Sequence, residues 1–157
     1  MANDAFVGDY DRRITRTELD DRAARAAGAL NAAGITADTP VAVIMRNDLA
    51  QMEVMRAAAH AGAVIVALNW HGAADEVAAI CEDSGARHVI IHRDLIGPLR
   101  PALAGRRVIG VTPGPALCAA YDIGDDAARA GDCPEWAALV DVARPVRDRE
   151  LMRPLLR

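Results

Sequence analysis

Asn69, Trp70 and His71 are the residues of this sequence whose types and position most favour a binding site. They follow the apolar run 63–68, which is short, rich in β-branched residues and typical of a strand buried on both faces. In open parallel sheets, ligands bind beyond the carboxyl ends of the strands, and this polar and aromatic turn would lie there. The structural alternative is that Trp70 only covers the end of the sheet while Asn69 binds the turn amides.

The cysteines and histidines give no comparable signal. Cys81, Cys118 and Cys133 are odd in number and never at C-x-x-C spacing, so they predict neither a zinc site nor a disulfide framework. His88 and His92 are four residues apart, a spacing that on a helix would let both bind one metal ion. They fall on a predicted strand, where four residues span roughly 13 Å. We therefore predict no metal site.

Motifs for phosphate binding and nucleophilic catalysis are absent from the sequence. It has no G-x-x-x-x-G-K-[ST] loop and no G-x-G-x-x-G turn after a strand, and Ser84 is its only serine. The adjacent carboxylates Glu82–Asp83 and Asp125–Asp126 are typical of solvated charges. All 18 basic residues are arginine, which binds phosphate in a fixed fork, whereas lysine is a mobile point charge. No catalytic residue is predicted in this chain.

Composition limits the class of protein. A chain of 157 residues is long enough for one domain, and 52% hydrophobic with 25% charged residues is typical of a soluble globular protein. The net charge of −4, without a basic block, argues against a nucleic-acid partner. No apolar run reaches the length of a membrane-spanning helix, and the N-terminus is acidic rather than a basic signal sequence. These features predict a cytoplasmic protein.

Apolar runs alternate with helical patterns along the chain. The predicted strands are 41–45, 63–68, 88–91 and 107–111. Thr15 and Glu18 form a capping box that predicts the start of a helix, and Asp48 with Gln51 predicts another. A third helix follows Asp75 and ends at a left-handed glycine, Gly85. This alternation predicts an α/β fold with a mainly parallel sheet and helices on both faces.

The two ends of the chain are less regular. Residues 6–7 and 13–14 predict a short hairpin. After residue 92, Asp94 could cap a short helix that prolines limit to a few turns, and residues 112–134 are predicted as a long surface loop. Pro134 suits the first position of a last helix. We therefore divide the chain into an α/β core, 1–111, and a segment with a loop, a short helix and a tail, 112–157. The tail carries apolar residues at Leu151, Met152, Leu155 and Leu156.

Residues 62–91 resemble a known family. The matching pieces are the Ala-Gly-Ala-Val lead into the strand, the turn Leu-Asn-Trp-His, and Glu-Asp-Ser-Gly-Ala-Arg before the next strand. Upstream, residues 13–19 and 38–47 are similar to the same family's first helix and first core strand. Together these pieces look like the N-terminal part of the AMP-forming acyl-CoA synthetases, the adenylate-forming ligases that bind AMP. The likeness covers about residues 10–95.

The resemblance implies a parent enzyme that uses ATP and Mg to convert a fatty or other carboxylic acid to an acyl-adenylate, and then transfers the acyl group to CoA. It leaves both an acyl-CoA ligase and an acyl-AMP ligase open. In this family, the segment that corresponds to Asn69, Trp70 and His71 can lie near the CoA nucleotide. The family's phosphate loop is expected to follow this chain. The chain alone is therefore expected to be an N-terminal fragment that binds no cofactor and is inactive.

The alternative is a free-standing α/β module that uses the same scaffold for binding or interaction. For the fragment, the expected partners are the rest of the ligase and a second copy of the chain, because four strands that are apolar on both faces need cover on both sides. Apolar surface left open would favour self-association.

Overall fold

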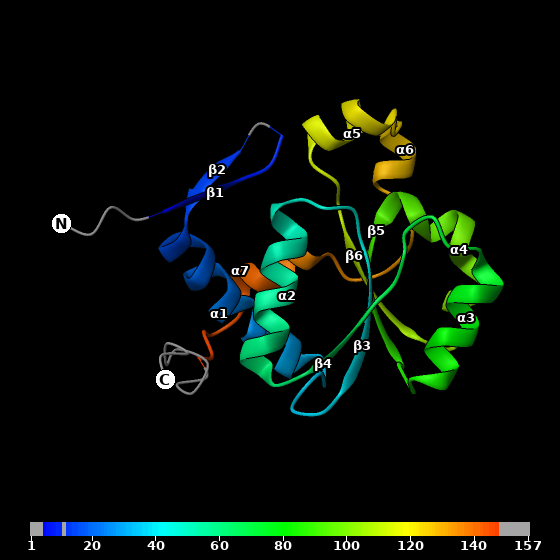
Figure 1. Ribbon diagram of the computed structural model, residues 1–157, viewed down its shortest axis with the longest axis horizontal. Coiled ribbons are helices and arrows are strands. Elements are labelled where there is room, and N and C mark those ends of the chain that lie inside the picture. The colour runs from blue at the N-terminus through cyan, green and yellow to red at the C-terminus, as the bar shows by residue number, and fades with distance from the viewer. Residues whose placement is uncertain (1–4, 11, 148–157) are drawn as a thin grey trace.

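A four-stranded parallel sheet forms the centre of the molecule (Figure 1). The computed structural model describes residues 5–10 and 12–147. The order in the sheet is β4-β3-β5-β6, so the strands predicted at 63–68 and 88–91 lie on either side of β3. The strands are β3 (Pro40–Ile44), β4 (Val64–Ala67), β5 (His88–His92) and β6 (Arg107–Val111).

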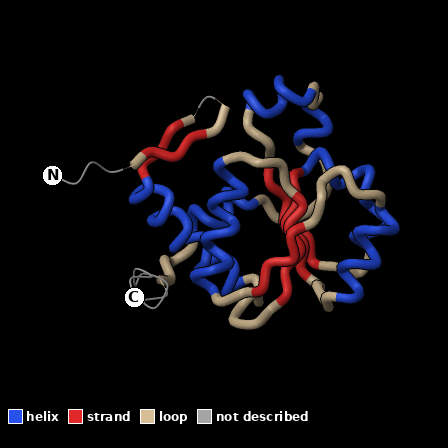
Figure 2. Tube along the Cα trace, in the orientation of Figure 1, coloured by secondary structure: helices blue, strands red, loops and turns tan. Residues whose placement is uncertain are grey.

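Helices cover both faces of this sheet, which confirms the predicted fold class (Figure 2). One face carries α1 (Arg16–Ala32), α2 (Leu49–Ala61) and α7 (Trp136–Val142), and the other carries α3 (Ala74–Asp83) and α4 (Ile96–Leu103).

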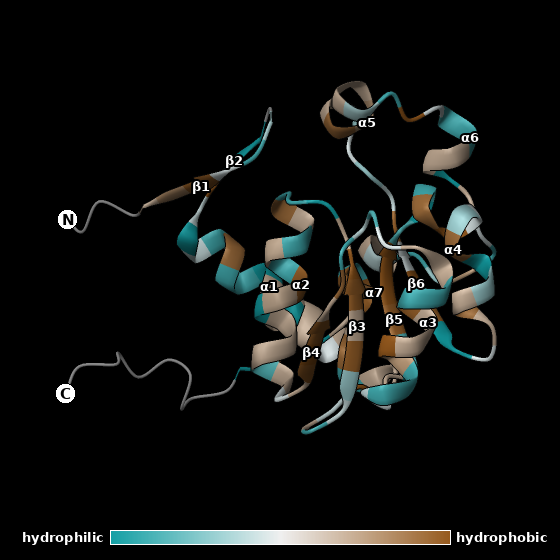
Figure 3. Ribbon diagram, turned by 45° about the vertical axis from the view of Figure 1, so that its right-hand side comes forward, coloured by the Kyte–Doolittle hydropathy of each residue, from teal (hydrophilic) through white to brown (hydrophobic). Residues whose placement is uncertain are grey.

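The central strand β3 supplies side chains to both layers of the core. Val41 and Val43 pack with α1 and α2, whereas Ala42 and Ile44 pack on the opposite side. This alternation follows from the two-residue period of a strand. Figure 3 shows that the central strands are mostly hydrophobic.

The local signals for helix ends are confirmed. Thr15 Oγ1 accepts a hydrogen bond from the Glu18 amide at 3.1 Å, and Glu18 Oε2 accepts one from the Thr15 amide at 2.7 Å. Asp48 Oδ1 accepts a hydrogen bond from the Gln51 amide at 2.8 Å and caps α2. Gly85, with φ of 70°, follows α3 in the left-handed conformation. The predicted hairpin also forms, from β1 (Phe6–Gly8) and β2 (Arg13–Thr15).

Two-sided burial is wrong for the strand predicted at 63–68. β4 lies at the edge of the sheet, and Val64 keeps 48% of its surface exposed. Its β-branched composition resembles that of the inner strands, and the composition of a strand does not distinguish an edge from a centre. Strand order decides the burial, because an edge strand has a neighbour on one side only.

The loop predicted at 112–134 is interrupted by two short helices, α5 (Pro115–Tyr121) and α6 (Asp125–Ala128). Pro115 occupies a first helical position of α5. The last helix starts later than predicted, at Trp136 with Glu135 as its N-cap, so Pro134 precedes it. The division of the chain at residues 111 and 112 stays a prediction. The apolar tail residues Leu151, Met152, Leu155 and Leu156 lie outside the described residues.

Asp94 does not cap a helix. It lies within a short 3-10 turn, η1 (Arg93–Leu95), that runs directly into α4, and the N-cap position of α4 is taken by Leu95, which makes no side-chain cap bond. The Asp94 carboxylate instead pairs with an arginine from another strand end.

A buried carboxylate joins the three helices on the first face of the sheet. Glu53 of α2 is only 3% exposed. Its Oε1 accepts a hydrogen bond of 2.7 Å from Trp136 Nε1 of α7, and its Oε2 pairs with Arg22 of α1. Two charge-assisted contacts offset the desolvation of a carboxylate at this position.

Gly28 of α1 allows the chain after α7 to pass directly over the helix. The Val146 amide donates to the carbonyl oxygen of Ala24 at 2.7 Å, so residues 143–146 lie against α1. A Cβ atom at position 28 would come within 1.9 Å of the carbonyl oxygen of Arg144. The close approach involves backbone, which cannot turn aside as a flexible side chain would.

We therefore predict that Gly28→Ala lowers the free energy of unfolding by about 1–3 kcal/mol, the usual effect of overpacking. Urea titration followed by circular dichroism measures this change. Gly97→Ala in α4 is the matched control, because a Cβ there meets nothing within 4 Å. It should leave the stability unchanged or raise it by up to about 1 kcal/mol through helix propensity. Equal stability of the two variants would contradict the close approach.

Candidate functional site

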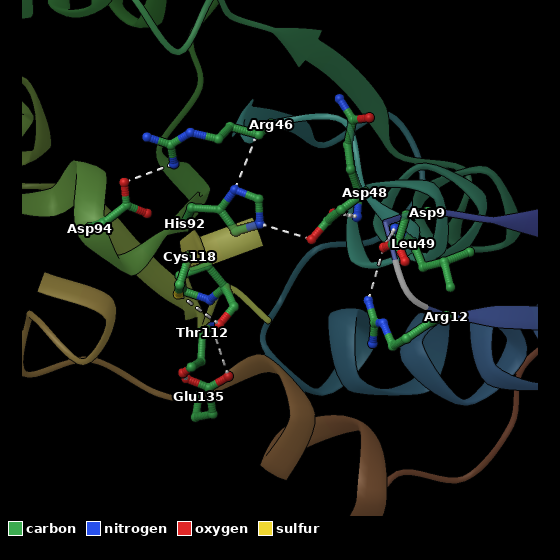
Figure 4. A network of polar contacts seen from close by, with 12 residues as sticks. Asp9, Arg12, Arg46, Asp48, Leu49, His92, Asp94, Thr112, Cys118 and Glu135 are labelled. Carbon is green, nitrogen blue, oxygen red and sulfur yellow. Dashed lines mark hydrogen bonds and ion pairs between the residues drawn. The ribbon is translucent and has the colours of Figure 1, made fainter. Parts of the chain in front are cut away.

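Polar side chains gather where the parallel strands end (Figure 4), and two aromatic side chains lie against them. β3 is followed by Arg46 and Asp48, β4 by Trp70, and β5 ends at His92 and continues to Asp94. Helix α5, after β6, contributes Tyr121. We call these six residues the carboxyl-edge cluster.

Arg46 lies at the centre of the carboxyl-edge cluster. The residue is 5% exposed, and its Nη1 is 2.7 Å from Asp94 Oδ2, whose side chain is 6% exposed. The approach lies off the ideal hydrogen-bond direction, so the contact is chiefly electrostatic. The guanidinium also lies 4.4 Å from the ring centroid of Trp70 and 4.9 Å from that of Tyr121. Desolvated cation–π contacts of this kind stabilise by up to about 2 kcal/mol.

His92 fixes the chain that follows β3 (Figure 4). Its side chain is fully buried, and its Nδ1 accepts a hydrogen bond of 3.1 Å from the Arg46 amide. The acceptor role of Nδ1 leaves the ring proton on Nε2. Nε2 faces Asp48 Oδ2 at 3.3 Å, while the other oxygen of Asp48 caps α2. The imidazole therefore connects the end of β3 to the start of α2.

Of the three predicted site residues, Asn69 has a structural role, Trp70 is half-buried and His71 is exposed. Asn69 Oδ1 accepts a hydrogen bond of 3.0 Å from the His71 amide, which is the turn-stabilising role considered for it. Trp70 is half-buried because Arg46 lies over its ring and Tyr121 meets it edge-on, with centroids 5.4 Å apart. His71 is exposed, and its ring lies 3.3 Å from that of Trp70. Their role in binding stays a prediction.

The tip of the N-terminal hairpin reaches the same edge of the sheet. Asp9 Oδ2 accepts a hydrogen bond of 2.7 Å from the Leu49 amide, at the positive N-terminus of α2. A hydrogen bond with Tyr121 raises the pKa of Tyr10. The hairpin is thus attached both to the start of α2 and to the carboxyl-edge cluster.

Arg93 holds the segment before α7 against the sheet. Its Nε donates to Glu135 Oε2 at 2.6 Å, and its two terminal nitrogens donate to the carbonyl oxygens of Ala130, Gly131 and Cys133. Glu135 also accepts a hydrogen bond of 2.9 Å from the Thr112 hydroxyl. These four hydrogen bonds occupy four of the five N–H donors of the guanidinium, so Arg93 is a structural group.

The thiols and histidines carry no metal-binding arrangement. Within residues 5–10 and 12–147, no three His, Cys, Asp or Glu side chains come close enough to share a metal ion. Burial raises the pKa of the Cys81 thiol and that of Cys118. Burial also lowers the pKa of His88, whose side chain lies on the first residue of β5. In the same part of the chain, no helix has the length and apolar character needed to cross a membrane.

Sequence reasoning missed Arg46, Asp94 and Tyr121. The first could have been found by the rule that singled out Asn69, because Arg46 also directly follows an apolar run. The other two carry no local signal: Tyr121 falls in a segment predicted as loop, and Asp94 resembles a helix cap. Their contacts depend on which strands are neighbours.

Comparison with known proteins identifies the family. The model of the family described as AMP-binding enzyme matches residues 2–145. The chain belongs to this family. The resemblance to AMP-forming acyl-CoA synthetases inferred from residues 62–91 is thereby confirmed.

Relatives in the family share part of their length with this chain. A feruloyl-CoA synthase from Amycolatopsis sp. is 38% identical over 101 residues, which are 64% of this chain and 20% of the synthase. A fatty acid–[acyl-carrier-protein] ligase from Streptomyces coeruleorubidus is 34% identical over 88 residues, 56% of this chain and 17% of the ligase. The chain thus spans about a fifth of the length of the relatives it matches.

Solved structures of ligases share the fold. A benzoate CoA ligase from Burkholderia xenovorans LB400 superposes with a TM-score of 0.72 at 25% identity, over 92% of this chain and 26% of the ligase. An acyl-CoA synthetase from Brucella canis gives a TM-score of 0.73 at 20% identity, over 94% of this chain and 27% of the synthetase. The latter shows likeness of fold alone.

The carboxyl-edge cluster leads to a stability prediction. Arg46→Met should lower the free energy of unfolding by about 3–5 kcal/mol, because it leaves the Asp94 carboxylate buried without its cationic partner. Combining it with Asp94→Leu should recover part of this loss, since no charge then stays buried. Denaturant titration of both single variants and the double variant measures the coupling.

Arg100→Met, which changes an exposed arginine on α4, is the control and should alter the stability by no more than about 0.5 kcal/mol. Strictly additive losses in the double variant would contradict an electrostatic pair between Arg46 and Asp94.

Proposed function

We propose that this chain forms the N-terminal portion of an ATP-dependent, AMP-forming ligase that activates a fatty or other carboxylic acid and transfers it to CoA. The observation that carries the proposal is the family match over residues 2–145. Relatives named as CoA and acyl-carrier-protein ligases support it. A cytoplasmic location belongs to the same proposal.

ATP and Mg would serve the complete enzyme by activating the carboxylate. The residues described here do not fit a magnesium site of their own, because no cluster of three His, Cys, Asp or Glu side chains forms among them. The carboxylates of the carboxyl-edge cluster already face cationic or amide partners. We therefore assign the adenylation chemistry to other parts of the enzyme, and to this chain a scaffolding role.

Trp70 and His71 are the residues that we assign to the path of CoA. They lie beyond the carboxyl end of β4, where ligands of open parallel sheets bind. Arg46 and Tyr121 hold the Trp70 ring in place. The exposed His71 imidazole beside it can donate a hydrogen bond to an anionic group. An aromatic surface held rigid by its neighbours loses little conformational entropy when it binds a ligand.

The isolated chain should show no acid-dependent exchange between ATP and pyrophosphate. The reason is that the sequence contains neither a phosphate-loop motif nor a lysine to stabilise the charge that develops on the transferred phosphate, and its described residues form no cluster that could hold a metal ion there. The assay covers short, medium and aromatic acids, with a complete ligase as positive control and a mock purification to exclude host enzyme. Exchange above the mock level would contradict the proposed scaffolding role.

The role of Trp70 and His71 is tested in a full-length ligase that carries this segment. Trp70→Ala combined with His71→Ala should raise KM for CoA by about 3- to 10-fold and leave the adenylation half-reaction nearly unchanged, because uniform binding of one substrate is lost. Met55→Ala, an exposed change on α2, is the control. Equal losses in both half-reactions would show a structural role instead.

A free-standing α/β binding module is the alternative reading of the same scaffold. It predicts that the chain acts without further ligase domains. Reading the gene beyond Arg157 distinguishes the two: continuation into a glycine-rich loop ending in Lys-Gly supports the ligase, and a stop codon supports the module.

A further inference from the structure

An apolar groove of about 940 Å³ runs along the free edge of the sheet. It lies between the C-terminal half of α1, strand β6 and helix α7. Its apolar lining comes from Ala29, Ala32, Ala33, Val108, Ile109, Leu139, Val142, Ala143 and Val146. A groove of this size and character is large enough to receive a protein side chain or a helix face.

The backbone of β6 is only partly satisfied along this groove. The Arg107 amide bonds to Arg87 on the β5 side, whereas the Gly110 amide donates to Pro134 on the opposite side at 2.9 Å. Residues two apart in a strand face the same edge, so the Val108 amide and carbonyl also point away from β5, toward the groove. Among the described residues, Pro134 and Glu135 pair with this edge only near Gly110 and Thr112. No described residue pairs with the first half of the edge.

A protruding side chain stands next to this hollow. Val142, at the end of α7, lines the groove and keeps 84% of its surface exposed, the largest exposed fraction among the large hydrophobic residues described. Leu139, one turn earlier, is half-buried in the same lining. An apolar projection beside an apolar hollow makes the surface complementary to itself, which a two-fold interface requires.

The charges around the groove also favour a surface that is complementary to itself. Arg106, Arg107 and Arg144 line it together with Asp132, and Asp141 is exposed on α7 next to Val142. The Arg106 guanidinium already contacts the Ala102 carbonyl and Glu82. Both signs thus occur on one rim. A two-fold axis brings the rim of one copy against the rim of the other, so arginines can face aspartates in both halves of the contact. A purely basic partner would meet the arginines with like charge.

We propose that a second copy of this chain occupies the groove, forming a two-fold dimer in which Val142 of each copy enters the groove of the other. The contact covers the open half of β6 and removes the exposed apolar surface of α7 from water. This inference goes beyond the ligase assignment, and failure of the dimer to form would leave the family match intact.

Sedimentation velocity from low to high micromolar concentration tests the proposal. The wild-type chain should shift from monomer to dimer, and Val142→Glu should raise the dimer dissociation constant at least about tenfold, because it places a charge in an apolar contact. Val64→Glu is the matched control, since Val64 is exposed on β4 at the opposite edge of the sheet. It should leave the dissociation constant unchanged, and circular dichroism should show both variants folded.

Hydrogen exchange locates the interface without any substitution. Peptides that cover β6 should become more protected as the concentration rises through the dissociation constant, since the Val108 amide is then shielded. A strict monomer at high micromolar concentration would overturn the proposal. Dissociation by Val64→Glu rather than Val142→Glu, or protection confined to β4, would overturn it as well. If that monomer also bound a hydrophobic dye, the groove would be exposed in solution, and its partner would be a different polypeptide rather than a second copy.

Discussion

Burial of the central strands on both faces is the constraint on which the rest of the structure depends. β3 and β5 send side chains into two separate cores, so the interiors of both strands are apolar and the polar side chains of β5, His88 and His92, stand at its two ends. Helices must then lie on both sides of the sheet, and polar residues collect where the strands end. The carboxyl-edge cluster exists because this is the first place where the chain leaves the apolar layers.

The charged residues of this cluster fix the relative positions of the strand ends more than they stabilise the fold. Desolvation of Arg46 and Asp94 opposes their attraction, so the net gain of a buried pair is small. What the pair fixes is position: the guanidinium holds Trp70 from β4 and Tyr121 from α5 on one side and Asp94 from the end of β5 on the other. Ends of three strands are thereby held in one geometry, a condition for any site built across them.

Local signals were sufficient for most of the fold. The capping pairs at Thr15 and Asp48 act over three residues, so the sequence reports them directly. The pairing of Arg46 with His92 joins residues 46 positions apart and depends on β3 lying beside β5. Strand order also decides the exposure of Val64, which composition alone predicts to be buried. Long-range contacts of this kind have no local pattern from which they can be predicted.

The contact between Glu53 and Trp136 has a consequence for synthesis of the chain. The two residues are 83 positions apart, so α2 leaves the ribosome long before α7. Until the indole arrives, the Glu53 carboxylate has only the arginine of α1 as a partner, and a carboxylate with too few partners resists removal from water. Water is therefore excluded from Glu53, between α1 and α2, when Trp136 packs against it. Helix α7, which is synthesised late, thus completes the layer of α1 and α2, which is synthesised early.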